Sequence, residues 1–148
     1  MLEKLTTNDK IIHTALFCLS NVTGGTKSHI RLFIDSEILV TTVIMMLRAN
    51  THVIAGEASW VLTNAISLCE LEDLKTLIRV YDKNLVHSLC HMLERCHAQK
   101  SCREANEILS ALDRLMSLDK ESGCEFTDEN SVAVMVEECG GFDAISAI

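Results

Sequence analysis

Two pairs of residues have the spacing of side chains that share one face of a helix. Trp60 precedes Asn64 by about one helical turn, and Phe17 precedes Asn21 in the same way. A carboxamide is both a donor and an acceptor, so it can bind both polar groups of a peptide backbone. Aromatic rings in a row form slots for the aliphatic stems of Lys or Arg and attract their charge. With Glu57 one turn before Trp60 as a partner for the cation, these residues predict a site for an extended basic peptide.

The two pairs belong to stretches that repeat along the chain. Residues 15–25 read ALFCLSNVTGG and residues 58–69 read ASWVLTNAISLC, and they align at an offset of 43 residues. A single pair is more simply explained by a core tryptophan and an asparagine at a helix end. Repetition at the length of a HEAT or armadillo unit favours a peptide-binding ladder. A third match over residues 112–117 is weak, because Asp113 replaces the aromatic residue and Ser117 the asparagine.

A second group of side chains has the chemistry of metal ligands. Its histidines and cysteines lie close together in the sequence: His87, Cys90, His91, Cys96, His97 and Cys102. His87 and His91 are one turn apart and could share a metal ion. The spacing fits no common zinc pattern, however, and the segment also reads as an ordinary amphipathic helix. We therefore expect no cofactor, and a metal-binding protein stays as an alternative.

The composition favours helices and argues against several classes of protein. Hydrophobic residues make up 48% of the 148 residues, aromatic residues only 4%, and proline is absent. Strand-rich sandwiches and barrels use aromatic residues and proline-containing turns, so we expect an all-α fold. The formal net charge of −8 gives no basic surface for a nucleic acid. Motifs for phosphate loops, zinc proteases and nucleophile elbows are absent, so we expect a binding protein and no enzyme.

The location of the protein follows from its apolar runs and cysteines. The longest apolar run, residues 38–47, is interrupted by two threonines and is far too short to cross a membrane. The first ten residues lack the apolar core of a signal peptide. The cysteines number seven, which is odd, and several lie in apolar helical runs. Reduced thiols in cytoplasm and nucleus are the simplest reading, with no membrane partner.

Periodicity, caps and breakers predict an order of short, middle and long helices that occurs twice. Gly24-Gly25 and Gly140-Gly141 are expected to end helices, because glycine adopts the left-handed capping conformation cheaply. Asn84 is an expected N-cap, and Ser101 with Glu104 has capping-box spacing. Residues 119–128 form the one long polar loop, and FDAISAI begins a last helix. The helices are expected over residues 8–22, 26–35, 38–48, 51–69, 70–81, 85–98, 101–118 and 129–138.

Three stretches resemble one family. ASWVLTNA, preceded by Gly56 and Glu57, resembles the EAxWxxSN stretch of importin-α (karyopherin-α), the adaptor family that recognises nuclear localisation signals. LSNVTGGT resembles the matching stretch of the neighbouring repeat. MVEECGGFDAI, residues 135–145, is similar to EECGGLDKI near the end of that family's armadillo domain. The resemblance covers essentially the whole chain, from about the seventh repeat to the beginning of the last.

The resemblance implies a right-handed α-solenoid of three-helix repeats whose third helices line a groove for basic signals. This chain corresponds to the minor signal-binding site, where Trp60, Asn64, Glu57 and Asn21 match binding residues. Phe17 stands where the family usually has tryptophan, and Thr14, in the position of Glu57, where it usually has an acidic residue. The segments that bind importin-β-type and export receptors are missing or truncated here.

The sequence therefore predicts an armadillo-repeat domain of about three repeats, truncated at both ends. Its expected divisions are a partial repeat 1–25, repeats 26–69 and 70–121, and a partial repeat 128–148. The expected function is nuclear import through basic linear signals, and the alternative is a generic armadillo scaffold. Neither end offers the polar outer face that caps a solenoid, so we also expect self-association.

Overall fold

The structure, a computed structural model, describes residues 6–121 and 131–146. In these residues the chain forms eight helices and no strand, which confirms the predicted all-α class. Residues 1–5 of the predicted partial repeat 1–25 lie outside the described part. The helices are α1 (Thr7–Thr23), α2 (Lys27–Ile34), α3 (Glu37–Met46), α4 (His52–Leu68), α5 (Leu71–Gln99), α6 (Cys102–Glu121), α7 (Val132–Glu138) and α8 (Gly141–Ser146).

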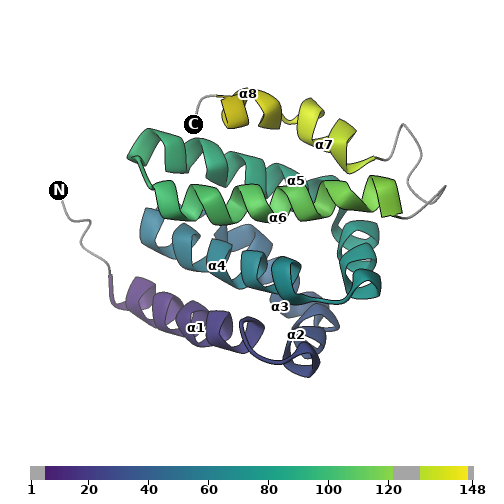
Figure 1. The fold of residues 1–148 in the computed structure, drawn as a ribbon. Coiled ribbons are helices and arrows are strands. Elements are labelled where there is room, and N and C mark those ends of the chain that lie inside the picture. The colour runs from purple at the N-terminus through teal and green to yellow at the C-terminus, as the bar shows by residue number, and fades with distance from the viewer. Residues whose placement is uncertain (1–5, 122–130, 147–148) are drawn as a thin grey trace.

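The long helices α1, α4 and α6 lie side by side in one layer (Figure 1). Behind them, α3 packs on α4 and the second part of α5 packs on α6, while α2 and the first part of α5 lie at one end of this layer. The helices α7 and α8 cover α5 at the far side of the stack. The molecule is thus a series of helix groups, each in contact with the next.

Polar contacts between successive groups join residues at nearly constant sequence separations. Asn64 on α4 bonds to α1 across 44 residues, Arg114 on α6 bonds to the end of α4 across 45, and Arg48 bonds to Ser88 on α5 across 40. Lys27 on α2 pairs with Glu70 across 43 residues. A constant separation means that equivalent helices run parallel and in register. These separations match the offset of 43 between the two aromatic–asparagine stretches.

The helices lie close to their predicted bounds, but Asn84, the expected N-cap, lies inside α5, where Asp82 and not Asn84 has the non-helical backbone. Thr26 caps α2 by accepting a hydrogen bond from the backbone N–H of His29. The two helices expected over 70–81 and 85–98 are present as the two parts of α5, which meet at a kink at Asp82, where φ is 43° and ψ is −132°. No proline or glycine interrupts this stretch, and aspartate tolerates positive φ better than most residues, so a single residue makes the bend.

Of the polar loop predicted over residues 119–128, residues 119–121 belong to α6 instead, and residues 122–128 lie outside the described part. Within this stretch Asp119 has a structural role. Its carboxylate accepts hydrogen bonds from the backbone N–H groups of Val132 and Ala133, at 2.9 and 3.1 Å. These N–H groups lie in the first turn of α7, where no intrahelical acceptor exists. Asp119 therefore fixes the start of α7 together with the Ser131 cap.

The two glycine pairs end helices for different reasons. Gly140 has a φ of 72° and takes the left-handed conformation that the sequence predicted. Gly24, at the end of α1, has a φ of −83°, so the same explanation is wrong there. A Cβ at Gly24 would lie 3.2 Å from the Ser20 carbonyl oxygen and 3.3 Å from Nδ2 of Asn64. A side chain at this position would crowd the Asn64 side chain, which reaches the end of α1 from α4.

The core is continuous, and α4 lies at its centre. Ten of its residues are buried, and several of these are small, which allows close approach of α1 and α6. The buried residues of α4 are Ile54, Ala55, Gly56, Ala58, Ser59, Val61, Leu62, Thr63, Ala65 and Ile66. The positions that α4 leaves accessible form one stripe, which includes Glu57, Trp60 and Asn64. Burial therefore decides which side chains of α4 reach the surface.

Two glycine-to-alanine substitutions test the packing. At Gly56 in α4 a Cβ meets no atom within 4 Å. Gly56→Ala should therefore raise the free energy of unfolding by about 0.5–1 kcal/mol through helix propensity. At Gly141 the Cβ would lie 2.7 Å from both Sγ of Cys90 and Cγ1 of Val136. Gly141→Ala should lower the free energy of unfolding by about 1–3 kcal/mol. Urea denaturation measures both, and effects of equal sign would contradict this packing.

Candidate functional site

The accessible stripe of α4 carries three of the five predicted site residues. Glu57, Trp60 and Asn64 are each partly exposed, and the residues between them are mostly buried. Their spacing of three and four residues puts them on one face of the helix. We call this set the α4 stripe. It is flanked by α1 on one side and by α6 on the other (Figure 1).

Asn64 binds a backbone carbonyl of the neighbouring helix. Its Nδ2 donates a hydrogen bond of 3.0 Å to the carbonyl oxygen of Ser20, in the last turn of α1. This carbonyl also accepts the backbone N–H of Gly24 at 2.9 Å, so Asn64 adds a second hydrogen bond that joins the end of α1 to α4. A carboxamide has two N–H donors and one acceptor oxygen, and this bond uses one donor.

Glu57 and Trp60 each contact a basic side chain from an adjacent helix. Nε2 of His13 on α1 lies 3.4 Å from a carboxylate oxygen of Glu57. The guanidinium carbon of Arg103 on α6 lies 4.9 Å from the centroid of the Trp60 ring. This distance is within the range of a cation–π contact, and tryptophan is the strongest aromatic partner for a cation. The stripe thus already contacts a carbonyl, an imidazole and a guanidinium of its own chain.

The second predicted pair, Phe17 and Asn21, lies on α1 and is more exposed. The Phe17 side chain is 54% exposed. Nδ2 of Asn21 donates a hydrogen bond of 2.8 Å to the Phe17 carbonyl oxygen within the same helix. The Thr14 hydroxyl also donates to its own helix, at the Lys10 carbonyl. This pair therefore has no contact equivalent to the one Trp60 makes with Arg103 in the described residues.

Sequence reasoning missed Arg103, His13 and the Ser20 carbonyl as partners of the stripe. One signal was present, because Arg103 follows Trp60 at the same offset that relates the two aromatic–asparagine stretches. Side chains one repeat apart meet when equivalent helices run parallel and in register. The Ser20 carbonyl carried no side-chain signal, and only the packing of α1 on α4 reveals it.

The His/Cys cluster does not come together. Cys90 and Cys96 are buried in the core, whereas His87, His91 and His97 are exposed on the other side of α5. Across residues 6–121 and 131–146, no three His, Cys, Asp or Glu side chains are placed to hold one metal ion. The cysteines of this segment pack as small apolar residues, as the amphipathic pattern indicated.

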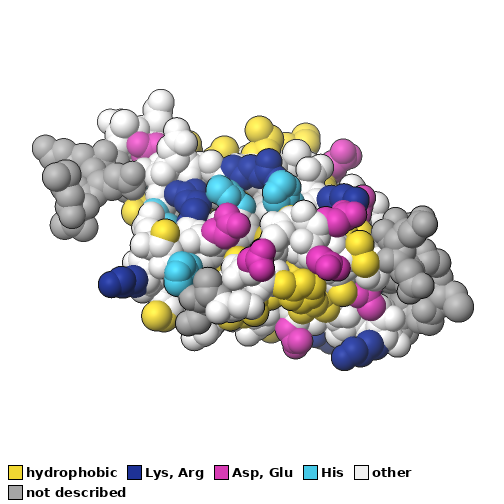
Figure 2. All heavy atoms as spheres, turned by 90° about the horizontal axis from the view of Figure 1, so that it is seen from above, with side chains coloured by type: hydrophobic (Ala, Val, Ile, Leu, Met, Phe, Trp, Pro, Cys, Tyr) yellow, Lys and Arg dark blue, Asp and Glu magenta, His cyan; other side chains and the backbone are white. Residues whose placement is uncertain are grey.

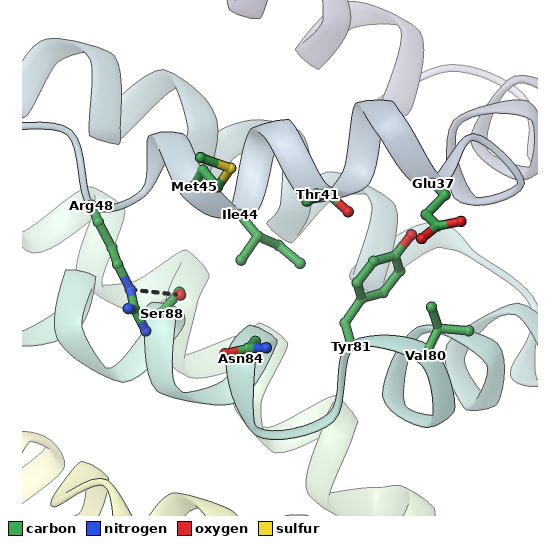
Figure 3. A pocket seen from close by; sticks show the side chains of 9 residues that line it. All are labelled: Glu37, Thr41, Ile44, Met45, Arg48, Val80, Tyr81, Asn84 and Ser88. Carbon is green, nitrogen blue, oxygen red and sulfur yellow. Dashed lines mark hydrogen bonds between the residues drawn. The ribbon is translucent and has the colours of Figure 1, made fainter.

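A pocket of about 350 Å³ lies between α3 and α5, next to the kink at Asp82 (Figure 3). Glu37 and Tyr81 line one end, and Arg48 lies at the other. Nε of Arg48 donates a hydrogen bond of 3.2 Å to Oγ of Ser88. Burial raises the pKa of the Tyr81 hydroxyl, and the charge of Glu37 raises it further. The polar groups of this pocket join α3 to α5, in the layer behind the α4 stripe.

A groove of about 570 Å³ between α1 and α3 is lined almost entirely by apolar side chains, among them Leu39, Val43 and Met46. The sequence Leu39-Val40 to Met46-Leu47 matches Leu85-Val86 to Met92-Leu93 in spacing. The counterparts Leu85, Leu89 and Met92 are completely buried. Val43 is buried like its counterpart, but Leu39 is 41% exposed and Met46 is partly exposed, so these two positions are open where the later unit covers them. We call this surface the α1–α3 groove.

The charged surface offers no area of a single sign on the face seen in Figure 2. Lys and Arg, Asp and Glu, and His side chains are intermixed there around a hydrophobic patch. No helix among the described residues has the length and hydropathy needed to cross a membrane.

Comparisons with known proteins give no relative. Neither a protein-family profile nor a curated protein matches this chain.

Burial of the cysteines predicts a difference in thiol reactivity. Burial raises the pKa of the Cys69 thiol to about 11 and that of Cys96 to about 11. Cys18 and Cys102 are exposed. At pH 8 only about one buried thiol in a thousand is ionised, and the thiolate is the reactive form. Alkylation followed site by site with mass spectrometry should modify Cys18 and Cys102 first. In urea all four cysteines should react at equal rates. Equal rates in the folded protein would contradict the structure.

Proposed function

We propose that this chain is a peptide-binding module of an armadillo-repeat solenoid and that it binds basic linear signals along the α4 stripe. The regular separation of contacts between successive helix groups supports the solenoid, because each unit then packs only on its neighbours. The resemblance of residues 56–65 and 135–145 to importin-α supports nuclear localisation signals as the ligands. The proposed setting is nuclear import, with the protein moving between cytoplasm and nucleus, and the proposed role is binding without catalysis.

One observation carries this proposal. The chain itself places a guanidinium over Trp60 and a backbone carbonyl on Asn64. These are the two kinds of group that an extended Lys/Arg-rich peptide would bring to the same side chains. The site therefore has the right chemistry in a partly exposed position, and not only the right residue types in the sequence.

The Phe17–Asn21 pair extends the site by one unit in this proposal. Phenylalanine gives a weaker cation–π partner than tryptophan, and Thr14 supplies no charge. We therefore assign the larger share of the binding energy to Trp60 and Asn64. A generic armadillo scaffold for another peptide remains the alternative, and indifference to the charge of the peptide would favour it. Metal binding has no geometric support in the described residues.

A titration with a Lys/Arg-rich peptide tests the proposal. Trp60 is the single tryptophan, so its emission reports directly on the stripe. We expect saturable binding that weakens with rising salt, since exposed charges are screened. Asn64→Ala should weaken binding about tenfold or more, because a peptide carbonyl or N–H would lose its partner. Asn84→Ala, an asparagine at the α3–α5 pocket, is the matched control and should leave binding unchanged.

The same titration separates the two functions. A peptide of equal length with Glu in place of Lys and Arg should not bind. Equal binding of both peptides would overturn recognition of a basic signal and leave the scaffold. Failure of every peptide to change Trp60 emission, with the fold intact by circular dichroism, would overturn the site itself.

We also propose that the chain self-associates through the α1–α3 groove. Its apolar lining has buried counterparts one unit along, so covering it removes apolar surface from water. Light scattering at high concentration should give a mass above the 16.4 kDa of one chain. Leu39→Glu should lower that mass, while Leu32→Glu, on an α2 position that is 70% exposed, should not. A single-chain mass at all concentrations would refute the proposal.

A further inference from the structure

Arg103 occupies the surface that the proposed ligand needs. A Lys or Arg side chain of a bound peptide gains its attraction from the face of the Trp60 ring. The guanidinium carbon of Arg103 lies 4.9 Å from the centroid of that ring. The two cations cannot stack on one face together, and they repel each other when close. Binding at this face therefore requires Arg103 to move away.

Other contacts of Arg103 do not explain its position. It lies in the first turn of α6, where a positive charge opposes the helix dipole. Its side chain is exposed and forms no ion pair with any residue in the described ranges. The contact with Trp60 is thus its one specific interaction with the described residues. A side chain held by one exposed contact is easily displaced.

The other two members of the stripe are held differently. The Ser20 carbonyl belongs to the backbone of α1, and Asn64 binds it with one donor while its second N–H and its oxygen can serve a ligand. His13 meets Glu57 at 3.4 Å and carries charge only when protonated. Only Arg103 carries a permanent charge of the same sign as the proposed ligand.

We propose that Arg103 is a specificity-determining residue that competes with basic peptides for the Trp60 ring. This inference rests on the proposed function and adds a regulator within the chain to it. A peptide cation binds only if it replaces Arg103 on the ring. Segments with few Lys or Arg residues therefore do not displace Arg103. Strongly basic peptides do displace it, but they bind less tightly than they would to a Trp60 ring without Arg103.

Substitution of Arg103 tests this directly. Arg103→Gln removes the charge and keeps most of the side-chain length. It should tighten binding of the Lys/Arg-rich peptide about two- to fivefold, the equivalent of one exposed cation–π contact. Lys120→Gln, at an exposed position near the other end of α6, changes the net charge equally. Its effect on peptide affinity should be less than half of the fold-change that Arg103→Gln gives. Anisotropy of a dye-labelled peptide measures all variants without relying on Trp60 emission.

A double substitution removes the remaining ambiguity. In a Trp60→Leu background the gain from Arg103→Gln should vanish, because there is no ring left to open. Unchanged or weaker binding by Arg103→Gln, with Asn64→Ala still impaired, would overturn the competition and leave the proposed function intact. An equal gain from Lys120→Gln would show a general charge effect and would also overturn it. If no variant binds the peptide, the proposed function fails and this inference fails with it.

Discussion

The burial of α4 between α1 and α6 is the constraint on which the rest of the structure depends. A helix that packs on both sides can expose only a narrow stripe, and ten buried residues of α4 leave little else. Small side chains at Ala55, Ala58 and Ala65 let the neighbouring helices approach. A larger residue at these positions would separate α1, α4 and α6, and α4 would then no longer expose only the narrow stripe. The candidate site is thus the part of α4 that is not buried against the neighbouring helices.

Side-chain donors then fix how each unit sits on the one before it. Arg114 donates a hydrogen bond of 2.7 Å to the Cys69 carbonyl after α4, and Arg95 donates one of 2.6 Å to the Ala49 carbonyl after α3. Asn64 does the same for α1. The Cys69 and Ala49 carbonyls follow helix ends, where intrahelical donors run out, whereas the Ser20 carbonyl also accepts the backbone N–H of Gly24. Hydrophobic burial is not directional, so these bonds supply the register.

This arrangement connects stability to the proposed binding. Asn64 contributes to the contact between α1 and α4 and also faces the proposed ligand with its remaining polar atoms. Trp60 packs partly into the stack and carries a cation on its accessible face. The site is therefore bordered by the buried core on one side and by the exposed Arg103 side chain on the other. Such a division suits a groove that binds many related segments, since the backbone contacts are common to all peptides and the cation slot selects among them.

Local sequence determined the helices and the register of the repeat. Periodicity and the offset of 43 residues follow from local chemistry and from self-similarity, which a sequence displays in full. It also placed Glu57, Trp60 and Asn64 on one face. Only the tertiary structure decided that the bend within α5 falls at Asp82, that Gly24 lies against Asn64, and that Arg103 lies over Trp60. Each of these depends on atoms distant in sequence or on backbone angles that no residue type dictates, and packing alone selects among the options that local chemistry leaves open.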